Sequence, residues 1–163
     1  SDVCSSDLHV LGICLGAQLI AHALGARVGP HPEGLREIGY YRIEPTPAGQ
    51  ALFDDEFHVY HWHREGFELP PGAELLATGQ TFRHQAFRIG EAVYGLQFHP
   101  EMTRHIMERW ITSERGAPQL SRPEVQTAEA QRAAAERHEP RMHAWVDRFV
   151  RRWLGAPAAR NAA

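Results

Sequence analysis

Apolar residues form two kinds of pattern in the first part of the chain. Residues 9–13 are a short apolar run that predicts a strand, and the residues after it repeat at helical spacing until Gly25. The apolar members of this predicted helix are Leu15, Leu19, Ile20 and Ala23. Further apolar runs bounded by Gly or Pro predict strands at residues 39–44, 58–62, 74–78, 86–89 and 93–98. Strands so closely spaced imply a sheet with antiparallel or mixed pairs.

Helical spacing replaces these runs in the C-terminal part. A helix predicted at about residues 103–114 has an apolar stripe made of Ile106, Trp110 and Ile111. Residues 124–139 favour a helix by composition, but they have almost no apolar face, so we expect them to be solvated. A final helix is expected to dock on the core through Met142, Trp145, Val146, Phe149, Val150 and Trp153.

The composition excludes several classes of protein. The 17 basic residues are scattered and the net charge is −3, so neither nucleic acid nor an anionic membrane surface is predicted as a partner. All of these residues are Arg; without Lys the chain has no P-loop, Schiff-base lysine or pyridoxal anchor. Cys4 and Cys14 form no disulfide framework, and residues 9–28 are too polar to span a membrane. No basic signal-peptide region precedes them, and we expect a cytoplasmic protein.

A thiol lies at the predicted turn between the first strand and the first helix. In Gly12-Ile13-Cys14-Leu15-Gly16, a glycine two residues to either side of Cys14 lets the backbone cross tightly, as in a nucleophile elbow. The helix N-terminus favours a thiolate, and the Leu15 N–H can hold an oxyanion. On this pattern alone, a buried structural cysteine is an equally good interpretation.

An imidazole and a carboxylate follow the last predicted strand. Gln97-Phe98-His99-Pro100-Glu101 places His99 at the strand end and Glu101 two residues later. A Cys–His pair oriented by an acid is the minimal machinery of nucleophilic catalysis, because His takes the thiol proton and returns it to the leaving amine. Each residue alone is typical of a surface position, whereas the combination with Cys14 favours catalysis.

These motifs resemble those of the class I (triad) glutamine amidotransferases, above all the stand-alone and GMP-synthase-type members. The similarity covers about residues 9–115 and is carried by residues 12–18, 25–26, 62–65, 69–73, 85–87 and 97–101. It implies an α/β, flavodoxin-like fold with a mixed sheet flanked by helices, and no cofactor. The implied roles are Cys14 as nucleophile, His99 as base, Glu101 as its orienter and Gln18 as a contact to glutamine. Trp62 and His63 are expected near the glutamine pocket, although GMP-synthase-type relatives often carry Ser at the position of Trp62.

The resemblance also implies a reaction. The side-chain amide of glutamine is hydrolysed through a Cys14 thioester to glutamate and ammonia, and a separate synthetase subunit is a candidate acceptor of the ammonia. Two alternatives stay open. One is a hydrolase of γ-glutamyl peptides or amines, which shares the elbow and the triad; the other is a non-catalytic homologue that only folds and binds.

The start of the chain departs from the family pattern. Family members begin with further strands and helices, including a Gly-rich loop that supplies a second oxyanion N–H. We therefore expect a linker-like or non-native segment at residues 1–8, an amidotransferase-like domain without its N-terminal strands at 9–115, and a helical extension at 116–163. Because losing one oxyanion donor costs about 10²–10³ in rate, little or no glutaminase activity is expected of this chain.

Three histidines invite a comparison with metal sites. On a strand, His61 and His63 share one face while His58 points to the other. No cysteine or His-x-x-x-His pair completes the set. No metal site is therefore predicted.

Overall fold

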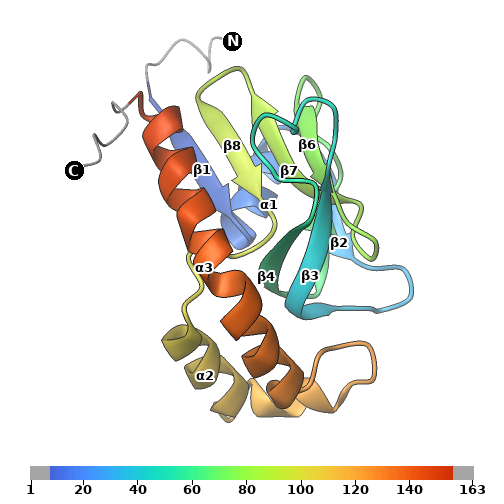
Figure 1. The fold of residues 1–163 in the computed structure, drawn as a ribbon. Coiled ribbons are helices and arrows are strands. Elements are labelled where there is room, and N and C mark those ends of the chain that lie inside the picture. The colour runs from blue at the N-terminus through green and yellow to red at the C-terminus, as the bar shows by residue number, and fades with distance from the viewer. Residues whose placement is uncertain (1–7, 156–163) are drawn as a thin grey trace, which may run out of the picture.

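The computed structural model describes residues 8–155 (Figure 1). Its elements, in chain order, are β1 (Val10–Ile13), α1 (Leu15–Ala23), β2 (Val28–Pro30), β3 (Glu37–Pro45), β4 (Phe57–His63), β5 (Glu65–Phe67), β6 (Glu74–Thr78), β7 (His84–Ile89), β8 (Val93–Leu96), α2 (Arg104–Thr112), the 3-10 helix η1 (Ala117–Ser121) and α3 (Ala128–Trp153). Every strand predicted above is present, with small shifts at its ends, whereas the three-residue strands β2 and β5 were not predicted. Residues 1–7, which include most of the predicted linker-like segment, and residues 156–163 lie outside the described range.

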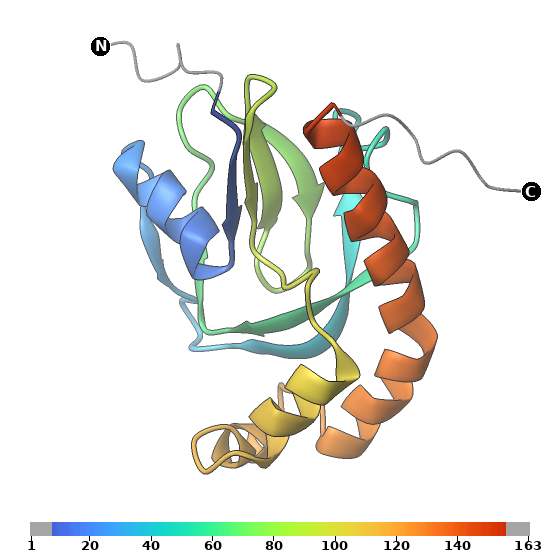
Figure 2. The ribbon, with the colours of Figure 1, turned by 90° about the vertical axis from the view of Figure 1, so that its left-hand side faces the viewer.

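The strands form a mixed sheet in the order β1-β8-β7-β6-β3-β4, beside a two-stranded β2-β5 sheet. β1 is parallel to β8, and the other pairs are antiparallel. α1 lies on one side of the sheet and α3 on the other (Figure 2). The predicted α/β fold with a mixed sheet flanked by helices is confirmed.

The larger hydrophobic core lies between the sheet and α3. Trp145 is 2% exposed and stacks on Phe53 and Phe149, with ring centroids 5.1 and 5.0 Å apart. Its indole N–H donates to the Leu52 carbonyl over 2.6 Å, so the one polar atom of the ring is satisfied. The apolar stripe predicted for the final helix is confirmed, and this stripe belongs to the same core as the sheet.

The segment predicted to be a solvated helix at residues 124–139 is different in the structure. From Ala128 onward it is the first half of α3, which continues through Pro140. Ala134 and Ala135 are buried, and the fully buried Gln131 accepts a 2.8 Å hydrogen bond from the Tyr60 hydroxyl. The prediction was wrong because alanines let a helix approach a sheet closely without any large apolar side chain.

The buried face of α1 does not coincide with its large apolar residues. Leu15 and Leu19 are 63% and 59% exposed, while Ala17, Gln18 and Ala21 face the sheet. The backbones of β1 and α1 approach so closely that only small side chains, or one with a hydrogen-bonding role, fit between them. Helical spacing located this helix but not its buried face.

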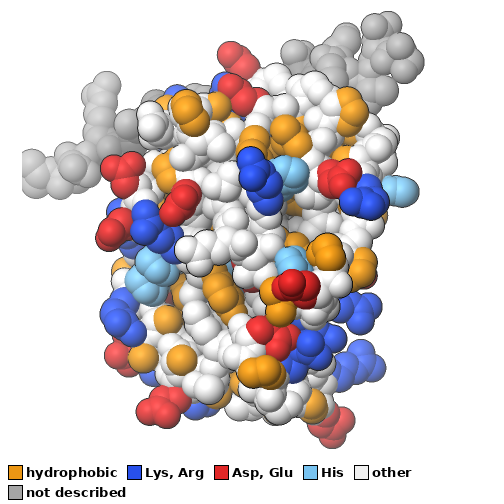
Figure 3. Space-filling model, turned by 90° about the vertical axis from the view of Figure 1, so that its right-hand side faces the viewer, with side chains coloured by type: hydrophobic (Ala, Val, Ile, Leu, Met, Phe, Trp, Pro, Cys, Tyr) orange, Lys and Arg blue, Asp and Glu red, His pale blue; other side chains and the backbone are white. Residues whose placement is uncertain are grey.

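The described surface carries mixed charge. On the face in Figure 3, acidic and arginine side chains are interspersed, in agreement with the scattered charge of the sequence. Within residues 8–155, no helix combines the length and the apolarity needed to cross a membrane.

Candidate active site

Cys14 occupies a strained turn between β1 and α1. It is the one non-glycine residue with positive φ within residues 8–155, at φ 48° and ψ −105°, a conformation that persists only where the surroundings impose it. Its backbone N–H donates to the Leu96 carbonyl over 2.7 Å. A Cβ on Gly12 would lie 2.6 Å from the backbone of Gly16, whereas a Cβ on Gly16 would meet nothing within 4 Å. The tight crossing thus depends on Gly12, and the steric role predicted for Gly16 is not needed.

Cys14 is the N-cap residue of α1, so the free backbone donors of the first turn follow it directly. Gln18 N–H donates to the Cys14 carbonyl over 3.1 Å as the first bond of the helix. The N–H groups of residues 15–17 therefore have no acceptor inside the helix. The helix N-terminus also carries a partial positive charge. Leu15 N–H, which follows the thiol-bearing residue directly, remains the candidate oxyanion donor.

His99 joins the thiol to a carboxylate. Its backbone N–H donates to the Tyr60 carbonyl over 2.8 Å, and its Nδ1 lies 2.7 Å from Glu101 Oε1. The imidazole is 13% exposed and the carboxylate 48%. Burial alone would lower the pKa of His99, but hydrogen bonds to Cys14 and Glu101 outweigh it and raise the pKa to about 9. The imidazole of His99 can therefore keep its proton at neutral pH.

Gln97 belongs to the site, although the sequence predicted no role for it. It is fully buried, its Nε2 lies 3.7 Å from Cys14 Sγ as a donor, and its Oε1 accepts from Gln18 Nε2 over 3.2 Å. The sequence could have indicated this role. Side chains two residues apart at a strand end share a face, and Gln97 is two residues before His99.

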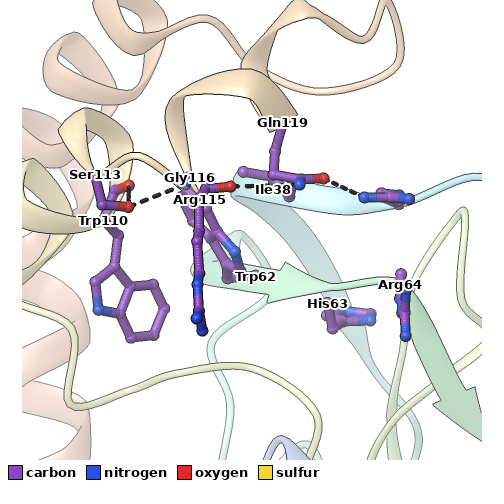
Figure 4. Close-up of a pocket in the computed structure, with 10 residues that line it drawn as sticks. Ile38, Trp62, His63, Arg64, Trp110, Ser113, Arg115, Gly116 and Gln119 are labelled. Atoms are coloured by element: carbon purple, nitrogen blue, oxygen red, sulfur yellow. Dashed lines mark hydrogen bonds between the residues drawn. The ribbon is translucent and has the colours of Figure 1, made fainter.

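The predicted substrate contacts are engaged within the protein. Gln18 Nε2 donates to the Glu65 carbonyl over 2.8 Å as well as to Gln97. His63 Nδ1 lies 2.9 Å from the same carbonyl. Both N–H groups of the Gln18 side-chain amide are thus used within the protein. A bound glutamine substrate could therefore contact Gln18 only through other atoms of that residue. Trp62 is half-buried and lines a cavity of about 470 Å³, into which His63 also opens (Figure 4).

A second imidazole–carboxylate cluster lies under this cavity. His63 Nε2 and His61 Nδ1 are 3.0 and 3.3 Å from Glu37 Oε2 and 3.1 Å from each other. All three side chains are buried, and His58 lies elsewhere, stacked on His138. The sequence indicated no third ligand beside the His61–His63 pair, whereas in the structure β3 places Glu37 opposite His63. Cross-strand register, which the sequence does not reveal, supplies the third group.

The three side chains of this buried cluster offer one ligand atom each to a cation. They also form a hydrogen-bonded network with one another and with Gln85. Gln85 Nε2 donates to Glu37 Oε2 over 3.0 Å, and His61 Nε2 has no partner. Burial holds the pKa of His61 well below its usual value. Burial would raise the pKa of Glu37, but His61 and the hydrogen bonds from His63 and Gln85 lower it.

Comparison with known proteins agrees with this geometry. The sequence model of the family Glutamine amidotransferase class-I matches residues 1–114. The glutamine amidotransferase-like protein YfeJ of Salmonella typhimurium is 38% identical over 141 residues, which are 83% of this chain and 54% of YfeJ. A glutamine-hydrolysing GMP synthase of Cytophaga hutchinsonii is 36% identical over 104 residues, which are 61% of this chain and 20% of that protein. The chain thus spans about half the length of the first relative and a fifth of the second.

Solved structures show the same fold. A glutamine amidotransferase of Thermotoga maritima superposes with a TM-score of 0.76 at 33% identity, over 88% of this chain and 61% of its own. A glutamine amidotransferase of Methylobacillus flagellatus gives a TM-score of 0.79 at 28% identity, over 94% and 65% of the two chains. The match to the family's sequence model identifies the family, and the strained turn at Cys14 and the His99–Glu101 pair are consistent with it. This chain belongs to the class I glutamine amidotransferases.

Proposed function

We propose that Cys14, His99 and Glu101 form a catalytic triad that hydrolyses the side-chain amide of glutamine to glutamate and ammonia. The observation that carries this proposal is the position of His99, whose Nδ1 lies 2.7 Å from Glu101 Oε1 and whose pKa is raised by the neighbouring Cys14 and Glu101. Family membership supports the reaction class.

Each group has a distinct part in the proposed reaction. The Cys14 thiolate attacks the amide carbon, and the Leu15 N–H stabilises the oxygen that becomes negative. The C–N bond breaks as His99 passes its proton to the leaving nitrogen. Water then adds to the thioester, gives a proton to His99 and releases glutamate with the thiolate restored. Glu101 holds the imidazole in the required tautomer.

We also propose that the ammonia passes to a separate synthetase. Support comes from a relative in Haloarcula marismortui that is named as one subunit of a glutamine-hydrolysing GMP synthase, 39% identical over 59% of this chain and 52% of its own length. Co-purification of the chain with a synthetase subunit from its own source tests this partner.

Ammonia release from glutamine tests the reaction itself. It is measured for the 163-residue chain and for any longer protein that its reading frame encodes. Cys14→Ala and Cys14→Ser are both expected to abolish release with the fold intact, because neither provides a thiolate. Turnover by Cys14→Ala at the unmodified rate contradicts the nucleophile assignment.

A further inference from the structure

Three possible ligand atoms converge in the buried cluster of Glu37, His61 and His63. Glu37 Oε2 lies 3.0 Å from His63 Nε2 and 3.3 Å from His61 Nδ1, and the two ring nitrogens are 3.1 Å apart. A tetrahedral Zn²⁺ ion with bonds of about 2.0–2.1 Å sets its ligand atoms about 3.3–3.4 Å apart. The three atoms therefore lie close to the spacing that a bound metal ion requires.

Hydrogen bonding leaves two of these atoms facing each other as acceptors. His63 Nδ1 lies 2.9 Å from the Glu65 carbonyl oxygen, which can only accept, so Nδ1 carries the ring proton. In the neutral imidazole, Nε2 then presents a lone pair to Glu37 Oε2, which also only accepts. A positive charge is needed beside these two atoms, and either a metal ion or a second proton on His63 supplies it.

The negative charge of Glu37 leads to the same requirement. Its side chain is 2% exposed, and no arginine within residues 8–155 lies within ion-pair distance of it. Burying a carboxylate is costly unless a cation or several hydrogen bonds compensate the charge. Gln85 Nε2 donates one such bond over 3.0 Å, and the two imidazoles are the other described partners. A dication held by all three groups compensates the charge directly.

The neighbours of the cluster are those that metal ligands have in proteins. A metal-bound histidine donates its other ring N–H to a carbonyl or carboxylate, and a metal-bound carboxylate accepts further hydrogen bonds. His63 and Glu37 both have such a partner, and Gln85 is itself held by a 2.9 Å hydrogen bond to the Phe82 carbonyl. Glu37 pairs with His63 across β3 and β4, and His61, two residues earlier, shares the face of His63. Two paired strands thus hold the three groups in position.

We propose that Glu37, His61 and His63 bind a divalent transition-metal ion, that Zn²⁺ suits their two nitrogens and one oxygen best, and that this ion ties β3 to β4. Two His and one Glu are a known ligand set for Zn²⁺, whereas Mg²⁺ and Ca²⁺ prefer oxygen ligands. The site is separate from Cys14 and does not depend on the proposed reaction. Because all three side chains are buried, the ion is taken up while the two strands pair during folding.

Metal retention after refolding tests the proposal. The 163-residue chain with Cys4→Ala and Cys14→Ala, which leave no thiol to bind metal, is unfolded with a chelator and refolded with Zn²⁺, Co²⁺ or Mg²⁺. After gel filtration, elemental mass spectrometry should find one Zn²⁺ or Co²⁺ per chain and no Mg²⁺. Zn²⁺ should also raise the denaturant midpoint above that of protein refolded with chelator, because the ion prefers the folded chain. X-ray absorption at the zinc edge should count two imidazole ligands.

Single variants in this background locate the ion. His61→Gln and His63→Gln should each weaken Zn²⁺ binding by more than the roughly 10–100-fold that loss of a ligand's hydrogen-bond partner costs, and Gln85→Leu should weaken it within that range. His58→Gln is the matched control and should retain one ion. His58 lies on the same strand, β4, and stacks on His138 away from the cluster.

Two results overturn the proposal. Refolded protein that retains no Zn²⁺ leaves a second proton on His63 as the compensating charge. Equal retention of Zn²⁺ in every variant places the ion elsewhere on the chain. Where a variant does not refold, the imidazole count at the zinc edge of the parent protein decides, because any number other than two contradicts this ligand set.

Discussion

Two imidazole–carboxylate clusters lie close together in this molecule and behave in opposite ways. His99 and Glu101 sit at a partly exposed strand end, and the pKa of His99 is raised to about 9. Glu37, His61 and His63 are buried between β3 and β4, and the pKa of His61 is lowered. Residue type alone therefore does not determine which histidine holds a proton.

The difference comes from burial and from the partner. His99 is beside a thiol that can become an anion and a carboxylate that keeps contact with water, so a proton on the imidazole is stabilised from both sides. His61 is fully buried and keeps one nitrogen without a partner, so its charged form is poorly solvated. The first cluster is suited to moving a proton and the second to holding strands in place.

A chain of hydrogen bonds runs from the buried cluster to Cys14. The Glu65 carbonyl meets both His63 Nδ1 and Gln18 Nε2, and Gln18 reaches Cys14 through Gln97. The buried cluster thereby fixes the groups that surround the nucleophile. We expect damage to it to appear first in stability and only then in rate.

The largest effect on catalysis is expected from His99→Asn. Without the base and proton donor, kcat should fall about 10³-fold or more, while the melting temperature changes little because the residue lies at a strand end. Initial rates and thermal unfolding measure the two quantities. His105→Asn, an exposed histidine of α2, is the control; a mild loss in His99→Asn would make His99 structural.

Glu37→Gln should have the opposite effect, with a large loss of stability and a smaller loss of kcat. It leaves His61 and His63 without their carboxylate partner, and breaking a buried pair costs about 3–5 kcal/mol of unfolding free energy. Denaturant unfolding measures the loss, with Glu44→Gln on the same strand as an exposed control. Unfolding with and without a chelator shows whether a bound cation contributes. An unchanged unfolding free energy in Glu37→Gln would contradict the structural role.

Glu101→Gln should have the smallest effect. The amide still orients the ring, so we expect a loss in kcat smaller than that of His99→Asn. Because the carboxylate is one cause of the raised pKa of His99, the pKa should fall towards 6.5. NMR titration of the imidazole, assigned with His99→Asn, measures this shift. An unchanged midpoint near 9 would show that Glu101 does not act on His99.

The raised pKa sets the sign of the pH dependence. The folded pKa of His99 is about 9 against an ordinary value of 6.5. Stabilisation of the protonated ring is thus complete below pH 6.5 and disappears as the pH rises through about 9. Activity should therefore fall on the alkaline side near pH 9, and in Glu101→Gln this fall should occur at lower pH.

Local sequence signals predicted the secondary structure and the neighbouring residues of the candidate site. The strand, turn and helix around Cys14 and the His99–Glu101 pair depend on neighbours within a few residues, which periodicity and motif spacing can describe. Glu37 escaped prediction because its partners are set by the register of β3 and β4. The buried faces of α1 and α3 could not be predicted from apolar spacing, because their buried alanines are determined by the close approach of the backbones.

Labelling by a glutamine-analogue electrophile tests whether Cys14 is an activated nucleophile. We expect one label per chain on the Cys14 peptide, located by mass spectrometry, with the rate reduced by glutamine and by His99→Asn. Cys4, the second cysteine of the sequence, is the internal reference for ordinary thiol reactivity. Labelling of Cys14 no faster than Cys4, and unaffected by glutamine, would contradict the claim that Cys14 is an activated nucleophile.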